Sequence, residues 1–135
     1  MKNPIVHFEI PADDVQRAKD FYEKTFGWNI TKFPLPGDEE YWGVRTTEVD
    51  AKTQQPKEVG AINGGLMKRK NPGQPFMNYI SVDSIDTMLK TIEANGGKVC
   101  LPKTEIAPGM GWIAAFQDTE GNPMGLHEVP ENMKK

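Results

Sequence analysis

The sequence is poor in the residues that support several kinds of chemistry. Among 135 residues it has one cysteine, Cys100, and two histidines, His7 and His127. A single cysteine excludes an internal disulfide and a metal cluster built on cysteines. We interpret Cys100 as a small buried hydrophobic residue rather than a nucleophile. The low cysteine content also predicts a cytoplasmic protein.

Long apolar runs and strongly basic stretches are missing as well. No segment approaches the roughly 20 apolar residues of a membrane-spanning helix, and the first residues lack the apolar core of a secretory signal. The net charge is −3, and the basic clusters are Lys68-Arg69-Lys70 and the two terminal lysines. We therefore expect no membrane and no nucleic acid among the partners.

The sequence does contain a repeated pattern. Residues 5–10 are rich in β-branched and aromatic side chains, which is typical of a strand. An apolar face with helical spacing follows, and Gly27 is the expected helix stop. An offset of 70 residues pairs Asp13 with Asp83, Val15 with Ile85, Ala18 with Met88, Tyr22 with Ile92, Glu23 with Glu93 and Gly27 with Gly97. A fixed offset of this kind indicates an internal repeat.

Each repeat predicts one strand, one helix and three further strands. The predicted strands are residues 5–10, 28–33, 41–46 and 60–67, then 76–82, 98–101, 112–117 and 123–129. The fold class is therefore α+β, with two βαβββ modules that pair into a curved antiparallel sheet cup. The length predicts a single domain, residues 1–135, made of module 1 (about 1–70), a linker (71–75) and module 2 (about 76–130).

Several short motifs occur at corresponding places in the chain. They are His7, Asp13-Asp14-Val15, Asp20-Phe21-Tyr22, Phe26-Gly27-Trp28, Ser81-Val82-Asp83, Gly96-Gly97 and Asp118-Thr119-Glu120-Gly121-Asn122. On these residues the chain resembles the glyoxalase, bleomycin-resistance and extradiol dioxygenase superfamily, also called vicinal oxygen chelate proteins. The resemblance covers nearly the whole chain. It implies a divalent metal held by the first and last strands of each module.

Carried over residue by residue, the resemblance places the four metal-ligand positions on His7, Gly65, Met77 and Gly125. Glycine offers no side chain, and the methionine thioether does not suit a hard divalent ion. Only His7 remains as a ligand of the usual kind. We therefore expect no cofactor, with a divalent metal as the alternative.

The two histidines and one carboxylate support three interpretations. His7 and Glu9 lie two residues apart on a strand and so share a face, and His127 is expected on the inward face of its own strand. These three side chains could form a facial metal triad. Alternatively, Glu9 orients His7 as an acid/base pair that exchanges a proton with a substrate. The third interpretation is structural: His7 is an ancestral residue that is only hydrogen-bonded to its neighbours, and His127 lies at a solvent-exposed edge.

A second group of side chains is a candidate ligand-binding surface. An apolar, aromatic-lined pocket suits a flat organic molecule. The candidate ligand-binding residues are Trp42, Asn63, Met67, Met77, Trp112, Phe116 and His127. For the two tryptophans, packing between helix and sheet is an equal alternative.

These features predict a protein that binds a small organic molecule in a cavity between its modules, without the complete metal site. The first alternative is a metal-dependent lyase or isomerase similar to lactoylglutathione lyase, or a dioxygenase. The second alternative is a protein-interaction module. The short linker with prolines at 72 and 75 allows modules to pair within one chain or between two, and we expect a homodimer.

Overall fold

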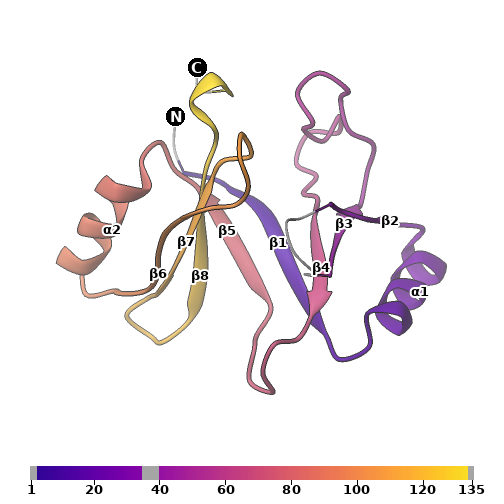
Figure 1. The fold of residues 1–135 in the computed structure, drawn as a ribbon, viewed down its shortest axis with the longest axis horizontal. Helices are drawn as coiled ribbons and strands as arrows, with labels where there is room; N and C mark the ends of the chain where they lie inside the picture. The colour runs from indigo at the N-terminus through magenta and orange to yellow at the C-terminus, as the bar shows by residue number, and fades with distance from the viewer. Residues whose placement is uncertain (1–2, 35–39, 134–135) are drawn as a thin grey trace. The chain divides into compact units, whose positions relative to one another are not determined.

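The computed structural model describes residues 3–34 and 40–133. The chain divides into two compact units, His7–Phe76 and Met1–Val6 together with Met77–Lys135. In Figure 1 each unit carries one helix beside its own set of strands. The helices are α1 (Val15–Phe26) and α2 (Ile85–Ala94). None of the helices in the described ranges has the length and apolar character that a membrane crossing requires.

The strands follow the predicted order in both modules. The first module has β1 (Ile5–Ala12), β2 (Asn29–Lys32), β3 (Tyr41–Arg45) and β4 (Gly64–Lys68), in the spatial order β2-β3-β4-β1. The second has β5 (Met77–Ser81), β6 (Lys98–Glu105), β7 (Trp112–Gln117) and β8 (Pro123–Glu128), in the order β5-β8-β7-β6. A short 3₁₀ helix, Glu131–Met133, follows. The α+β fold of two βαβββ modules is thus confirmed.

The sheets are mixed rather than purely antiparallel. Within each module the first and last strands run parallel, β1 beside β4 and β5 beside β8. The remaining neighbours are antiparallel. The long connection between the first and last strands of each module, which contains the α-helix and two strands, provides the crossover that a parallel pair requires.

The first helix has a defined start and stop. The Asp14 side chain accepts a hydrogen bond from the Arg17 backbone N–H and so caps the first turn. Gly27 ends the helix with φ = 73°, a left-handed conformation that glycine adopts without strain, and its N–H returns to the Glu23 carbonyl. The helix therefore ends where the sequence predicts.

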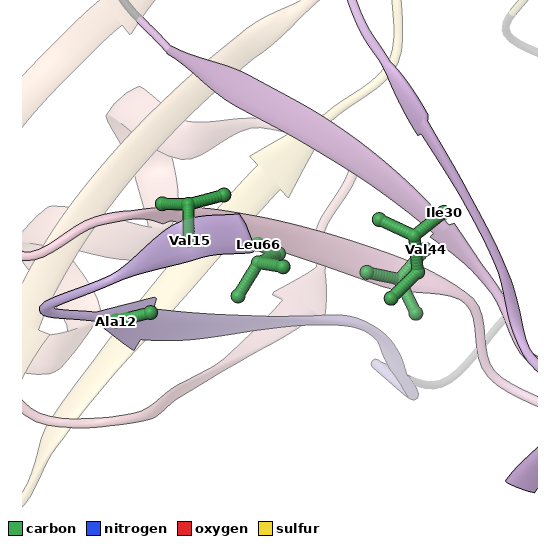
Figure 2. Close-up of a cluster of buried hydrophobic side chains, with 5 residues drawn as sticks. All are labelled: Ala12, Val15, Ile30, Val44 and Leu66. Carbon is green, nitrogen blue, oxygen red and sulfur yellow. The ribbon is translucent and has the colours of Figure 1, made fainter. Parts of the chain in front are cut away.

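The helix-side core of the first module joins all of its elements. Figure 2 shows the five buried side chains of this cluster, which come from β1, α1, β2, β3 and β4. They are Ala12, Val15, Ile30, Val44 and Leu66. Phe8, Ile10, Tyr22, Trp28 and Trp42 pack around them. Alternate residues of each strand consequently point away from α1, and these carry the candidate site.

The second module repeats this core. Its buried residues are Val82, Ile85, Ala114, Phe116 and Leu126, with Ile80, Met88, Leu89 and Ile92 packed against them. Leu126 is 1% exposed. Leu126 is paired with Ile80 across β8 and β5, and this register puts both side chains on the helix-packed face.

Truncation of Leu126 tests this core. We expect Leu126→Ala to lower the free energy of unfolding by about 2–5 kcal/mol, because a fully buried side chain leaves a cavity. Leu101, which is 38% exposed on β6, is the matched control, and Leu101→Ala should cost much less. Urea unfolding measures both values, and equal losses would contradict the register.

The turn before β8 is held by one carboxylate. Asp118 Oδ1 accepts the backbone N–H groups of Glu120 and Asn122, each at 2.9 Å, and Oδ2 accepts the Asn122 side chain at 3.1 Å. The hydrogen bonds from Asn122, followed by the one from Glu120, lower the pKa of Asp118 from its usual value. The ionised form therefore stabilises the fold.

Asp118→Asn should lower the melting temperature at pH 7. A carboxylate whose pKa is lower in the folded state contributes stability above its unfolded pKa, and this contribution is lost as the pH falls through the folded value. The difference between wild type and variant should therefore shrink below about pH 4. Thermal unfolding followed by circular dichroism between pH 7 and pH 2.5 measures this difference. A gap that stays constant with pH would contradict the assigned role.

One interpretation from the sequence is wrong. Cys100 is exposed on β6 and is not a buried hydrophobic residue. The register of β6 against β7 shifts between Val99 and Leu101, so Cys100 lies at an irregularity of the strand.

Candidate functional site

The face of the first sheet that points away from α1 carries the candidate site. Phe8 and Ile10 pack on the helix side, so His7 and Glu9 of β1 lie on the opposite face. Glu9 is paired with Gly65 of β4, and Gly65 is paired with Gly43 of β3. Two glycines at the centre leave this part of the face without side chains of their own.

His7, Glu9 and Tyr41 form a polar cluster on this face. The Tyr41 hydroxyl donates to Glu9 Oε2 at 3.0 Å and lies 2.9 Å from His7 Nε2. His7 Nε2 and Glu9 Oε2 are 3.5 Å apart, and the two side chains are 33% and 21% exposed. The predicted pair of His7 and Glu9 is thus in contact, with Tyr41 added as a third member.

The hydrogen bonds assign the protons of the polar cluster. A phenol has one hydrogen, and Tyr41 donates it to Glu9. His7 Nε2 must then donate its own N–H to the Tyr41 oxygen. This arrangement forms a chain from imidazole to phenol to carboxylate. Such a chain can pass a proton between a bound molecule and Glu9.

Gly65 is the reason that Tyr41 reaches this position. A Cβ atom at residue 65 would lie 1.9 Å from the Tyr41 hydroxyl oxygen and 2.3 Å from Cζ. The tyrosine hydroxyl therefore occupies the space that a side chain at position 65 would need. Any carboxylate introduced there would meet the phenol before it reached a metal.

In the second module a tyrosine also fills the side-chain space of a glycine, but this tyrosine lies on the first strand, β5. A Cβ atom at Gly125 would lie 2.3 Å from Cδ2 and 2.4 Å from Cε2 of Tyr79. Tyr79 is 6% exposed and is paired with Gly125 across β5 and β8. The ring of Tyr79 therefore fills the position that the resemblance assigns to a metal ligand.

The residues present do not fit the divalent metal that the resemblance implies. Two of the four expected positions are glycines whose side-chain space is taken by tyrosines, and a third is Met77. Across residues 3–34 and 40–133, no three His, Cys, Asp or Glu side chains gather in a group that could hold a metal ion. The polar cluster contributes one imidazole and one carboxylate, fewer protein ligands than a typical metal site uses.

Three further candidate ligand-binding residues, Met67, Met77 and His127, lie on three different strands. Met67 of β4 is 8% exposed and is paired with Tyr41. Met77 begins β5 and is half-buried. His127 is half-buried on β8, where it is paired with Ser81 and Ile113. His127 belongs to the other unit, and the facial-triad hypothesis stays a prediction.

The aromatic candidates lie among the helix-side residues. Trp42 packs against the core of the first module, and its indole donates to Glu40 at 3.3 Å. Trp112 packs against the second core, with the Lys103 ammonium 4.7 Å from its ring centroid. Phe116 is buried in that same core. These three side chains fill space between helix and sheet, and we do not include them in the proposed site.

Asn63 has a structural task. Its Oδ1 accepts the backbone N–H groups of Thr46 at 2.8 Å and Thr47 at 3.3 Å, and also the Thr46 hydroxyl at 3.0 Å. These bonds hold the chain where it leaves β3. Its Nδ2 is buried and has no partner among the described residues.

Sequence reasoning missed Tyr41 as a site residue. Tyr41 is 32 residues from Glu9 and 24 from Gly65, and only the strand register brings the three together. The glycine at position 65 is the sequence feature that could have indicated Tyr41 as a site residue. A missing side chain at the centre of a sheet leaves room for a neighbour's ring.

The fold and the polar cluster define a protein built on two βαβββ modules with polar groups on the open sheet face. The family model described as the Glyoxalase/Bleomycin resistance protein/Dioxygenase superfamily matches residues 4–126. The chain belongs to this superfamily.

Two relatives are similar along nearly the same stretch. A glyoxylase-like domain-containing protein from Didymella fabae is 32% identical over 123 residues, which cover 90% of this chain and 91% of the relative. A longer protein, CFP32 from Mycobacterium bovis, is 28% identical over 123 residues. The chain spans only 44% of the length of that second relative.

Solved structures share the fold at low identity. A hypothetical protein from Bacillus halodurans superimposes with a TM-score of 0.69 and 15% identity, and the match covers 100% of both chains. Methylmalonyl-CoA epimerase from Mycobacterium tuberculosis gives a TM-score of 0.65 at 12% identity, over 96% of this chain and 89% of that one. At this identity the likeness shows the fold alone.

Proposed function

We propose that this protein binds a small organic molecule on the open face of its first module, without the complete metal site of the superfamily. The polar cluster of His7, Glu9 and Tyr41 provides the hydrogen-bonding groups. The partly exposed imidazole and carboxylate are accessible to a ligand, and Gly43, which is paired with Gly65, leaves room beside them.

One observation carries this proposal. The Tyr41 hydroxyl occupies the side-chain space of Gly65, the strand position that the resemblance assigns to a metal ligand. A hydrogen-bond donor and acceptor thus stands where a carboxylate is expected. Ligand recognition at this face then depends on hydrogen bonds rather than on coordination.

The hydrogen-bonded chain of the polar cluster also favours a second candidate function. A phenol between an imidazole and a carboxylate can act in general acid–base catalysis. The protein would then be an enzyme that removes a proton from its ligand, or adds one, without a metal. Methylmalonyl-CoA in D2O is a direct test, and deuterium uptake that is lost in Tyr41→Phe would favour this candidate.

Elemental analysis of the purified protein tests the absence of a metal site. We expect far less than one Fe, Mn, Ni or Zn ion per chain, because the ligand positions lack suitable donors. About one tightly held ion per chain, lost in His7→Ala, would contradict the proposal and favour the metal-dependent lyase, isomerase or dioxygenase.

A ligand screen tests the binding itself. Native mass spectrometry of the protein with a library of flat organic acids, amides and phenols should retain at least one compound. Tyr41→Phe should weaken its binding about tenfold, the effect of one good hydrogen bond. Tyr22→Phe is the matched control, since Tyr22 packs against the helix-side core of the same module. If no compound is retained, or if both variants bind equally, the proposal fails.

The homodimer, the cytoplasmic location and the predicted cavity remain predictions. Sedimentation at micromolar concentration tests the first of them. A clean 15.1 kDa species would exclude an obligate dimer. The protein-interaction module would gain support if the ligand screen failed while the protein formed a stable complex.

A further inference from the structure

A hollow of about 470 Å³ lies on the first module, apart from the polar cluster. It is formed where β2 and β3 lie side by side and by the loop that follows β3. Its lining residues are Gly27, Asn29, Arg45, Thr46, Thr47, Glu48, Val49 and Lys57. This volume is within the range of small-molecule sites.

The hollow has an excess of positive charge. Arg45 is exposed, and no hydrogen bond or ion pair within the described part of the chain engages its guanidinium. Lys57 and Glu48 form an ion pair at 3.8 Å, with side chains that are 58% and 86% exposed. That pair balances itself, so Arg45 supplies the net charge. A guanidinium is well suited to bind a carboxylate or phosphate through two parallel hydrogen bonds.

The hollow and the polar cluster belong to one sheet face. Tyr41, Gly43 and Arg45 alternate along β3 and point to the same side. Four residues of a strand span about 13 Å, which a small organic molecule together with two long side chains can bridge. Gly43 lies between them, and among the described residues a Cβ atom there would meet only the Thr31 carbonyl oxygen at 3.9 Å. No side chain of β3 itself therefore covers the sheet surface between the hollow and the polar cluster.

We infer that the ligand of this face is a small organic anion. Its acidic group is bound by Arg45 in the hollow, and its body lies over Gly43 toward Tyr41. This inference rests on the proposed function, because it names the class of molecule that the same face binds. The charge of Arg45 then selects an acid over the neutral compound of the same shape.

Cinnamate and its neutral amide, cinnamamide, are the probes for this inference. Two-dimensional NMR of the ¹⁵N-labelled protein follows each titration. Cinnamate should cause saturable shifts of the Arg45, Thr46 and Thr47 amides, and cinnamamide should bind about tenfold more weakly. Arg45→Gln should reduce cinnamate affinity by a similar factor. Arg17→Gln removes a surface arginine on α1 and should leave the affinity unchanged.

The outcomes separate this inference from the proposed function. If both probes bind equally, or if Arg45→Gln binds cinnamate as tightly as wild type, the inference is wrong while small-molecule binding at this face stands. The same conclusion holds if the cinnamate-induced amide shifts are reduced in Tyr41→Phe but unchanged in Arg45→Gln. If neither probe causes a saturable shift, the anion site is rejected, and the native mass spectrometry screen decides the proposed function by itself. Arg45 is exposed, so its variant should fold.

Discussion

Replacement of Gly125 by alanine is expected to lower the free energy of unfolding by about 3 kcal/mol. The added Cβ would lie 2.3 Å from Cδ2, 2.4 Å from Cε2 and 2.8 Å from Cγ of Tyr79. Cγ is fixed close to the backbone, so the ring cannot swing away without leaving its rotamer. Tyr79 is buried, and the strands must therefore separate to admit the methyl group.

Gly43 provides the matched control for this experiment. It is also a glycine within a strand, and the nearest neighbour of an added Cβ is the Thr31 carbonyl oxygen at 3.9 Å. Gly43→Ala should change stability by no more than about 0.5 kcal/mol, since the site has room. Urea unfolding of both variants gives the comparison, and similar losses would show that the close approach of Tyr79 has no energetic importance.

Gly65→Ala is expected to act through Tyr41. The clashing atoms here are the hydroxyl and Cζ at the far end of the tyrosine, which can rotate outward. Rotation breaks the hydrogen bonds to Glu9 and His7, and we expect a loss of about 2 kcal/mol together with loss of ligand binding. In a Tyr41→Ala background the same change should cost less than about 0.5 kcal/mol, because the obstacle is gone.

A double-mutant cycle measures this coupling. Stabilities of wild type, both single variants and the double variant should give an interaction energy of about 1–2 kcal/mol. The ¹⁵N signals of the imidazole add a structural readout, since only two histidines exist and His127 serves as an internal reference. In wild type the neutral form of His7 should carry its hydrogen on Nε2. Additive stability changes would disprove the contact between Tyr41 and residue 65.

The repeat made most of the fold predictable from sequence. The 70-residue offset gave the βαβββ order of both modules, and the strand at Trp112–Gln117 has the predicted bounds. Local signals were sufficient at such places, because alternation and stop residues are properties of short segments. The parallel pairing of first and last strands lay beyond these signals, since it depends on contacts between distant segments.

The candidate site was predictable only in part. His7 and Glu9 share a strand face by periodicity alone, and the structure shows them together. Tyr41 joins them because its ring leans across an empty position on a neighbouring strand, which no local pattern encodes. Asn63 is a candidate ligand-binding residue from the sequence, and the structure adds that its side-chain oxygen accepts the backbone N–H groups of Thr46 and Thr47. Short polar side chains serve backbone groups more often than other side chains.

The pairing of a glycine with a tyrosine in both modules has an evolutionary consequence. A mutation that placed a carboxylate at position 65 or 125 would meet a ring that is already there. The first effect of the new carboxylate would therefore be a loss of stability. A second mutation would then have to remove the tyrosine ring. Each position would therefore need two substitutions, one at the tyrosine and one at the glycine, before a carboxylate could be accommodated without a clash.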